Sequence, residues 1–249
     1  MSTGRLLDGK TVLVTGGSRG LGLAICRAVA EAGGRVAFTY TREEETALAA
    51  LAAIRAAGAE GRAHRVSVLD SPGTEAMVRA IEKEWGGLDA LVNNAGVSQN
   101  LPLGLLEEED WDLVMDVNVK GTFLTSRAVL RGMIRRKSGV ILNLGSLAGM
   151  RTIESPIHYC ASKAAIVGLT RALSKEVARH GIRVNCLAPG LLEDGLGKNL
   201  PDYKLADYLK HCALGRVGTL AEVARLAVSM LSGEWSFATG ETVVADGGV

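Results

Sequence analysis

Short runs of apolar and β-branched residues alternate with longer segments of helical periodicity along the 249-residue chain. The run Thr11–Thr15 leads through a glycine-rich turn into apolar residues spaced as on one helix face, from Leu21 to Val29. Strands that alternate with helices pair in parallel, because each connection must cross back over the sheet. The pattern therefore predicts one α/β domain over residues 1–249, a doubly wound parallel sheet with helices on both faces. The seven predicted strands are Thr11–Thr15, Arg35–Tyr40, Ala63–Val68, Leu88–Asn93, Val140–Leu144, Ile182–Leu187 and Thr242–Ala245. After the first helix, further helices are predicted over Glu43–Ala57, Thr74–Trp85, Trp111–Arg136, Tyr159–His180 and Leu220–Leu231.

Charge and cysteine usage exclude several classes of protein. The 28 Lys and Arg residues nearly balance 27 Asp and Glu residues, which argues against a nucleic-acid binder. No apolar run is long enough for a membrane span, and the first ten residues lack the apolar core of a secretory signal. The four cysteines form no C-x-x-C pair, so they predict reduced thiols rather than disulfides or a metal site. We expect a cytoplasmic protein without a metal, nucleic-acid or membrane partner.

The turn after the first strand reads Thr15-Gly-Gly-Ser-Arg-Gly-Leu-Gly22. Glycines at this spacing let the backbone approach a pyrophosphate closely, and the next helix directs its free amides at the anion. The alternative is a tight glycine-rich turn that binds nothing. The strand before it and the helix after it favour the phosphate site.

Five further motifs occur in register with this turn. They are Asn93-Asn94-Ala95-Gly96, Asn118, Ser146 with Tyr159-x-x-x-Lys163, Pro189-Gly190, and Thr239-Gly240 with Asp246-Gly247-Gly248. Together they resemble the short-chain dehydrogenase/reductase family over almost the whole chain, with most similarity to the 3-oxoacyl-(acyl-carrier-protein) reductases. The resemblance implies a Rossmann fold, a nicotinamide cofactor and reduction of a carbonyl group.

The residue pattern explains how Tyr159 would act as an acid and base. Tyr159 and Lys163 are one helical turn apart and share a face, and a nearby ammonium lowers the pKa of a phenol. Ser146 can donate to a carbonyl oxygen on which negative charge develops. The resemblance adds that Asn118 positions a water and Lys163, and that Lys163 binds the nicotinamide ribose. Alternatively, Tyr159 and Lys163 form a surface pair, Ser146 caps a helix, and Asn118 caps a helix kink.

The second strand ends without the carboxylate that an NAD-selective site uses for the ribose 2′-hydroxyl. Tyr40, Thr41 and Arg42 stand there, and Arg19 lies in the glycine-rich turn, so a 2′-phosphate and therefore NADP(H) is expected. Arg42 could instead pair with Glu43–Glu45. Ser67 replaces the family's acid near adenine, with Asp70 three residues later, and Asp194 replaces a threonine near the nicotinamide. The expected cofactor residues are Gly16, Ser18, Arg19, Gly20, Leu21, Gly22, Tyr40, Thr41, Arg42, Val68 through its backbone, Asn94, Ala95, Gly96, Tyr159, Lys163, Pro189, Gly190 and Leu192.

The substrate and the partners follow from the resemblance. It makes residues 191–213 a substrate lid, whose mixed apolar residues suit an acyl chain or a small ketone. An acidic acyl carrier protein would meet the basic residues Arg131, Arg135, Arg136, Lys137 and Arg179, which otherwise are ordinary cations at helix ends. Relatives form tetramers, so we expect a homotetramer. The alternatives are a dehydrogenase or ketoreductase for a free ketone, sugar, steroid or polyketide, and a non-catalytic NADP-binding sensor. His158 and Cys160 flank Tyr159, and we expect neither to react.

Overall fold

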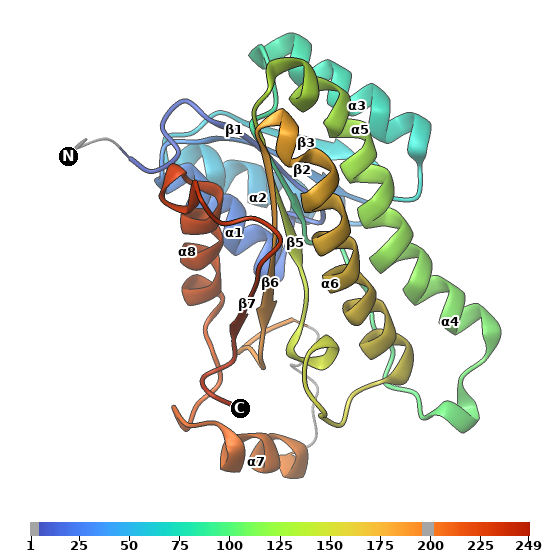
Figure 1. The fold of residues 1–249 in the computed structure, drawn as a ribbon. Helices are drawn as coiled ribbons and strands as arrows, with labels where there is room; N and C mark the ends of the chain where they lie inside the picture. Colours follow the sequence, from blue (N-terminus) through green and yellow to red (C-terminus); the bar gives the residue numbers. More distant parts are fainter. Residues whose placement is uncertain (1–4, 196–201) are drawn as a thin grey trace.

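The computed structural model describes residues 5–195 and 202–249, and in it a seven-stranded, all-parallel sheet forms the centre of the molecule (Figure 1). The strand order is β3-β2-β1-β4-β5-β6-β7, so the chain winds outward in both directions from β1 and β4. This confirms the predicted doubly wound Rossmann-type domain. The strands are β1 (Thr11–Val14), β2 (Arg35–Tyr40), β3 (Gly61–Arg65), β4 (Ala90–Asn93), β5 (Gly139–Leu144), β6 (Ile182–Pro189) and β7 (Thr242–Ala245).

Helices cover both faces of the sheet (Figure 1). Helices α1, α2 and α8 lie on one face, and α3, α5 and α6 lie on the other. Short helical turns occur at Leu103–Leu105, Leu147–Gly149, Ala178–His180 and Gly233–Trp235. The helices are α1 (Gly20–Glu31), α2 (Glu44–Ala56), α3 (Ser71–Trp85), α4 (Glu108–Met115), α5 (Gly121–Arg136), α6 (Ile157–Val177), α7 (Asp202–His211) and α8 (Leu220–Leu231).

Strand β1 shows why its sequence forms a doubly covered strand. Val12 and Val14 pack toward α1 and α8, whereas Leu13 packs toward the opposite face with Ile141 and Met133. All three β1 side chains are fully buried, and each contributes roughly 1.5–3 kcal/mol relative to an exposed position. Strand β3, at one end of the strand order, is polar by contrast, and most of its side chains are only partly buried.

Most predicted elements begin and end within three residues of the observed bounds, and two departures have a visible cause. Strand β3 spans Gly61–Arg65 instead of Ala63–Val68, and it ends where the amide of Val66 donates both to Tyr40 O and to His64 O. The helix predicted over Trp111–Arg136 is interrupted by a π-helical turn at Asp116–Lys120, which separates α4 from α5. Helix α7 lies in the segment that we described only as a mixed lid.

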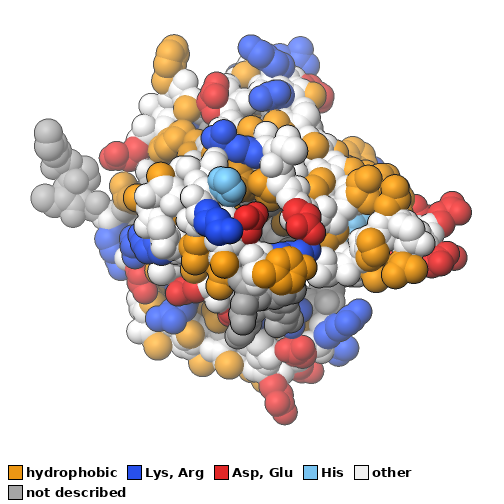
Figure 2. Space-filling model, turned by 90° about the horizontal axis from the view of Figure 1, so that it is seen from below, with side chains coloured by type: hydrophobic (Ala, Val, Ile, Leu, Met, Phe, Trp, Pro, Cys, Tyr) orange, Lys and Arg blue, Asp and Glu red, His pale blue; other side chains and the backbone are white. Residues whose placement is uncertain are grey.

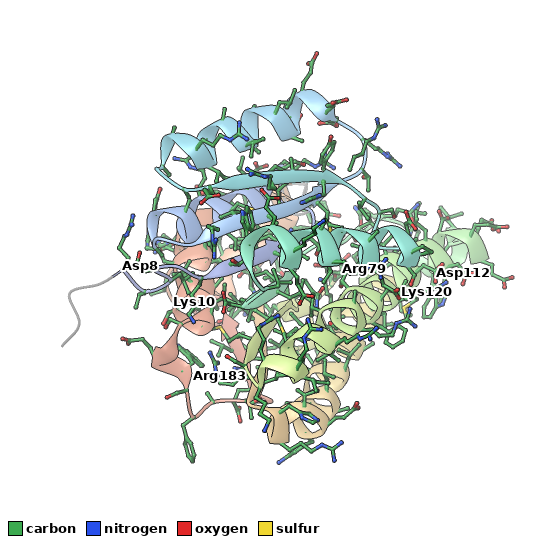
Figure 3. All side chains as sticks on the ribbon, turned by 90° about the horizontal axis from the view of Figure 1, so that it is seen from above. Asp8, Lys10, Arg79, Asp112, Lys120 and Arg183 are labelled. Carbon is green, nitrogen blue, oxygen red and sulfur yellow. The ribbon has the colours of Figure 1, made fainter. Side chains whose placement is uncertain are left out.

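The amino ends of the strands are held by charged side chains that are far from the candidate site (Figure 3). Lys10 precedes β1 and lies 3.7 Å from Asp89, which also accepts from the amide of Thr11. Arg183 on β6 donates to the carbonyls of Met230 and Ser232, at the end of α8. Negative charge at a helix C-terminus favours a cation there, so Arg183 anchors α8 to the sheet.

A buried polar network joins the carboxyl ends of β4 and β5. Asn93 and Asn143 are register partners on the two strands, and Asn93 Nδ2 donates to Asn143 Oδ1 at 2.8 Å. Asn143 Nδ2 donates to Thr170 of α6 at 2.9 Å, and Asn93 also bonds to Ser126 and Thr125 of α5. Because every member is buried and paired, the network fixes α5 and α6 relative to the sheet.

We predict that Asn143→Leu lowers the free energy of unfolding by about 1–3 kcal/mol, because Asn93 and Thr170 each lose a partner in a site without water access. Urea denaturation followed by circular dichroism measures the change. The matched control is Asn100→Leu at an exposed position, which should shift stability by less than about 0.5 kcal/mol. Equal midpoints for the two variants would contradict the role of the network.

Candidate active site

The predicted site residues come together at the carboxyl edge of the sheet. They follow the ends of β1 to β6 or lie on α6 and the π-helical turn, and this edge is the lower end of the molecule in Figure 1. Figure 2 looks onto this edge and shows apolar side chains mixed with both signs of charge. Parallel strands place their carboxyl ends at one edge, which explains how such distant motifs meet.

Hydrogen bonds clamp the turn after β1 to the turn after β4. The side-chain oxygen of Thr15 accepts from the amides of Asn94 and Ala95, both at 3.0 Å. Asn94 Nδ2 donates in return to the carbonyls of Thr15 and Gly16 at 3.0 and 3.1 Å. A Cβ on Gly22 would lie 2.1 Å from Gly16 O, so only glycine lets α1 pack onto this turn.

The start of α1 fits a phosphate group. Helix α1 begins at Gly20, no side chain caps it, and its first turn holds no acidic residue. Gly20 has a positive φ of 53°, and a Cβ there would have no atom within 4 Å, so the turn borders open space. Unpaired amides at a helix N-terminus attract an anion, so this turn fits the pyrophosphate of a dinucleotide.

The residues expected around adenosine lie next to this turn. Thr41 and Arg42 are exposed just beyond β2, and Arg42 has no ion pair among the described residues. The pairing considered for Arg42 is instead made by Arg19, which lies 3.5 Å from Glu43. Val68 packs its side chain against Gly121. Asp70 caps α3 by accepting from the amide of Gly73 at 3.0 Å, which gives it a structural role.

Ser146, Tyr159 and Lys163 form one cluster. Ser146 follows β5 and caps the turn Leu147–Gly149, so its cap role and a catalytic role are compatible. Its side chain interacts with Tyr159 on α6 and favours the ionised phenol. The Lys163 Nζ atom lies 5.6 Å from the centroid of the Tyr159 ring and donates to Leu144 O at 2.7 Å.

Burial dominates the protonation of this cluster. It lowers the pKa of Lys163 to about 8, opposed by the nearby Cys186 thiol. Burial raises the pKa of Tyr159, and the hydrogen bond from Ser146 opposes that rise. We expected Lys163 to lower the pKa of Tyr159, but desolvation of the phenol outweighs every other effect on it in this structure.

Asn118 lies in the π-helical turn and is fully buried. Its side chain accepts from the amide of Val97 at 2.8 Å and donates to Val97 O and to Ser162 Oγ, both at 3.0 Å. It therefore ties the segment after β4 to α6, immediately before Lys163. These partners lie outside the π-helical turn itself, and the positioning of a water by Asn118 stays a prediction.

The start of the loop after β6 packs against α7. A Cβ on Gly190 would meet Tyr208 Oη at 2.4 Å, and that hydroxyl accepts from the amide of Leu191 and donates to Asp246 O. Tyr208 thus docks α7 onto the loop, a role that sequence reasoning missed because it treated residues 191–213 only as a mixed apolar lid. Tyr203, by contrast, is 68% exposed. Leu196 and Leu200 lie outside the described residues.

The bend after Pro189 and Gly190 continues into an isolated bridge between Leu192 and Gly218. The Glu193 side chain accepts from the amide of Leu220 at 3.0 Å, at the start of α8. Asp194, at the position of the expected threonine, is half-buried. The Glu193 carboxylate is therefore directed to the start of α8 rather than to the site.

Two residues beside Tyr159 take no part in the cluster. His158 is fully buried, and burial lowers its pKa against the opposing charge of Asp110. Neither ring nitrogen has a hydrogen-bond partner in the part of the chain that the structure describes. The thiol of Cys160 contacts Ser155 O at 3.7 Å. Among residues 5–195 and 202–249, no three His, Cys, Asp or Glu side chains gather as a metal site. No helix in the described part of the chain is long and apolar enough to cross a membrane.

Comparison with known proteins agrees with this geometry. A family model for short chain dehydrogenases matches residues 10–204. The chain is 38% identical to a 3-oxoacyl-(acyl-carrier-protein) reductase of Vibrio cholerae, over 98% of each chain. It is 35% identical to the reductase of the same name from Staphylococcus aureus, over 96% of this chain and 98% of the other. A solved structure from Sinorhizobium meliloti, provisionally assigned as a short-chain alcohol dehydrogenase, superposes with a TM-score of 0.92 at 36% identity, covering 97% and 96% of the two chains.

We predict that kcat/KM for the nicotinamide cofactor falls as the pH rises through about 8, where Lys163 loses its proton. The sign follows from burial: the folded-state pKa lies below 10.5, so the ammonium is present below about 8 and absent above it. A pH–rate profile of carbonyl reduction measures this fall. A profile that stays flat to pH 10 would show that Lys163 keeps its proton in the site.

Proposed function

Because the chain belongs to the short-chain dehydrogenase family, we propose that it is an NADPH-dependent reductase of 3-oxoacyl thioesters carried by acyl carrier protein. As a member of this family it is a nicotinamide-dependent oxidoreductase that acts on a carbonyl or hydroxyl group. The observation that carries the finer proposal is the Ser146–Tyr159–Lys163 cluster in a chain that is similar to 3-oxoacyl-(acyl-carrier-protein) reductases over nearly its whole length.

The reaction needs a proton donor and a site for negative charge. NADPH supplies the hydride when bound. Ser146 donates a hydrogen bond to the carbonyl oxygen, and Tyr159 passes its phenolic proton to that oxygen as the alcohol forms. The ammonium of Lys163, held by Leu144 O, stabilises the phenolate that remains. Asn118 keeps the segment 96–98 and α6 in place, and a water beside it would return the proton.

Charge at the adenosine end supports NADPH rather than NADH. The end of β2 carries no carboxylate, Arg42 is exposed just beyond it, and Arg19 is exposed in the first turn. Two guanidinium groups match a 2′-phosphate, which accepts bidentate hydrogen bonds.

The place of the carrier protein depends on assembly. The basic residues at the end of α5 lie at the amino edge of the sheet, because α5 runs back to the start of β5. Arg136 is occupied by an ion pair with Glu82 at 3.0 Å and a bond to Leu88 O, whereas Arg131 and Lys137 are exposed. The cations can therefore serve a site only in a neighbouring copy.

Exposed apolar side chains on α4 and α5 support such an assembly, a homotetramer in our proposal. Trp111, Leu113, Phe123 and Ile134 are 37–48% exposed. If two copies pack antiparallel through these helices, the basic end of one α5 lies beside the carboxyl edge of its neighbour.

A second candidate is a dehydrogenase that acts on a free ketone or secondary alcohol. The structural neighbour from Sinorhizobium meliloti favours it, since that protein is provisionally assigned as an alcohol dehydrogenase. A non-catalytic cofactor sensor finds no support, because Tyr159 and Lys163 are both present and clustered.

The test of the reaction is NADPH oxidation at 340 nm with a 3-oxoacyl thioester, in wild type and in Tyr159→Phe. We expect the variant to retain its fold and to lose activity by roughly 10²–10⁴-fold, because the proton donor is removed. Turnover of free ketones without turnover of thioesters would favour the second candidate. Unchanged activity in Tyr159→Phe would contradict the mechanism.

We predict that Arg131→Glu with Lys137→Glu raises KM roughly three- to tenfold for a carrier-bound substrate and leaves KM for a small thioester unchanged. The exposed Arg225 on α8 provides a matched control as Arg225→Glu. Light scattering run in parallel measures the assembly on which the effect depends. Equal changes for both substrates would contradict carrier docking at these residues.

A further inference from the structure

An ion pair joins the two segments that we assign to the adenosine end of the cofactor. Arg19 lies in the turn between β1 and α1, and Glu43 lies between β2 and α2. Arg19 Nη1 is 3.5 Å from Glu43 Oε1. The guanidinium expected to bind a 2′-phosphate is therefore already faced by a carboxylate of the same chain.

Glu43 is held in this position by a second contact. Its Oε2 atom accepts from the hydroxyl of Thr46 at 3.0 Å, which leaves Oε1 for Arg19. Glu44 and Glu45 follow directly, and neither makes a side-chain contact of this kind within the described residues. One carboxylate of three is thus directed at Arg19.

The ion pair between Arg19 and Glu43 is exposed to solvent and can be displaced. The Arg19 and Glu43 side chains are 77% and 59% exposed, so solvent screens their attraction and a competing anion can displace Glu43. Arg42, the other arginine at this end, has no ion pair in the described part of the chain. Before a ligand binds, Arg19 is therefore paired with Glu43, whereas Arg42 has no ion pair among the described residues.

We propose that Glu43, by occupying Arg19, lowers the selectivity of the enzyme for NADPH over NADH; this rests on the proposed use of NADPH. A phosphate monoester carries a charge of about −1.5 to −2 at neutral pH. The 2′-phosphate of NADPH must displace Glu43 from Arg19 or bind Arg19 with the Glu43 carboxylate nearby. Either way, the affinity of the protein for NADPH is lowered. A ribose 2′-hydroxyl is neutral and a hydrogen-bond donor, so Glu43 does not oppose NADH.

The test uses Glu43→Gln, which removes the charge and keeps an oxygen that can accept from Thr46. Fluorescence titration of the full-length protein gives Kd for NADPH and NADH directly, without turnover. We expect NADPH to bind about two- to tenfold more tightly at low salt and NADH to bind unchanged. The gain should shrink as salt is raised. The control Glu45→Gln removes a charge from the same helical turn and should change neither Kd.

Arg19→Gln, alone and combined with Glu43→Gln, shows whether Glu43 acts through Arg19. If Glu43 acts by occupying Arg19, the tighter NADPH binding caused by Glu43→Gln is lost when Arg19→Gln is also present. Tighter binding that persists in full in the double variant overturns the proposal. If wild type prefers NADPH and Glu43→Gln leaves the NADPH-to-NADH ratio unchanged, the role of Glu43 is wrong and the cofactor proposal stands. If wild type binds both cofactors equally and Arg19→Gln does not weaken NADPH, the cofactor proposal is wrong and the role of Glu43 falls with it.

Discussion

The hydrogen bonds between Thr15 and the Asn94 turn connect the two strands from which the whole site is built. Strands β1 and β4 are adjacent in the sheet, and the chain winds away from them in opposite directions. A crevice at such a switch point receives the ligand in open α/β sheets. The clamp sets how closely the two turns approach, and this fixes where α1 points its free amides relative to the segment held by Asn118.

A second constraint is the cost of keeping Lys163 in a buried place. Its surroundings lower its pKa, and its ammonium donates a hydrogen bond to Leu144 O. The polar network of Asn93, Asn143 and Thr170 lies beneath the same stretch of α6 and holds it against the sheet. Rigid packing around Lys163 therefore keeps an energetically unfavourable charge beside Tyr159, where it is useful.

The fold was predictable because its signal is local and repeated. Apolar and β-branched runs of four to six residues, alternating with helical periodicity, predict the number of strands and the layers. The errors have local causes as well. Polar β3 ends early because Val66 bonds to two carbonyls, and the helix around Asn118 contains a π-helical turn that an apolar pattern does not reveal. Helix α7 was missed because its apolar residues are mixed with charged ones.

The sequence by itself determined the α/β architecture, the residue types of the candidate site and the absence of a carboxylate at the end of β2, since these follow from order and spacing along the chain. Only the tertiary structure decided which side chains pair with one another. It paired Arg19 with Glu43, committed Arg136 to Glu82, and used Asn118 and Tyr208 to tie loops together. It also decided that burial governs the pKa of Tyr159. Distances between residues far apart in the chain, and their exposure to water, arise only when strands and helices pack, and these two quantities set electrostatic energies.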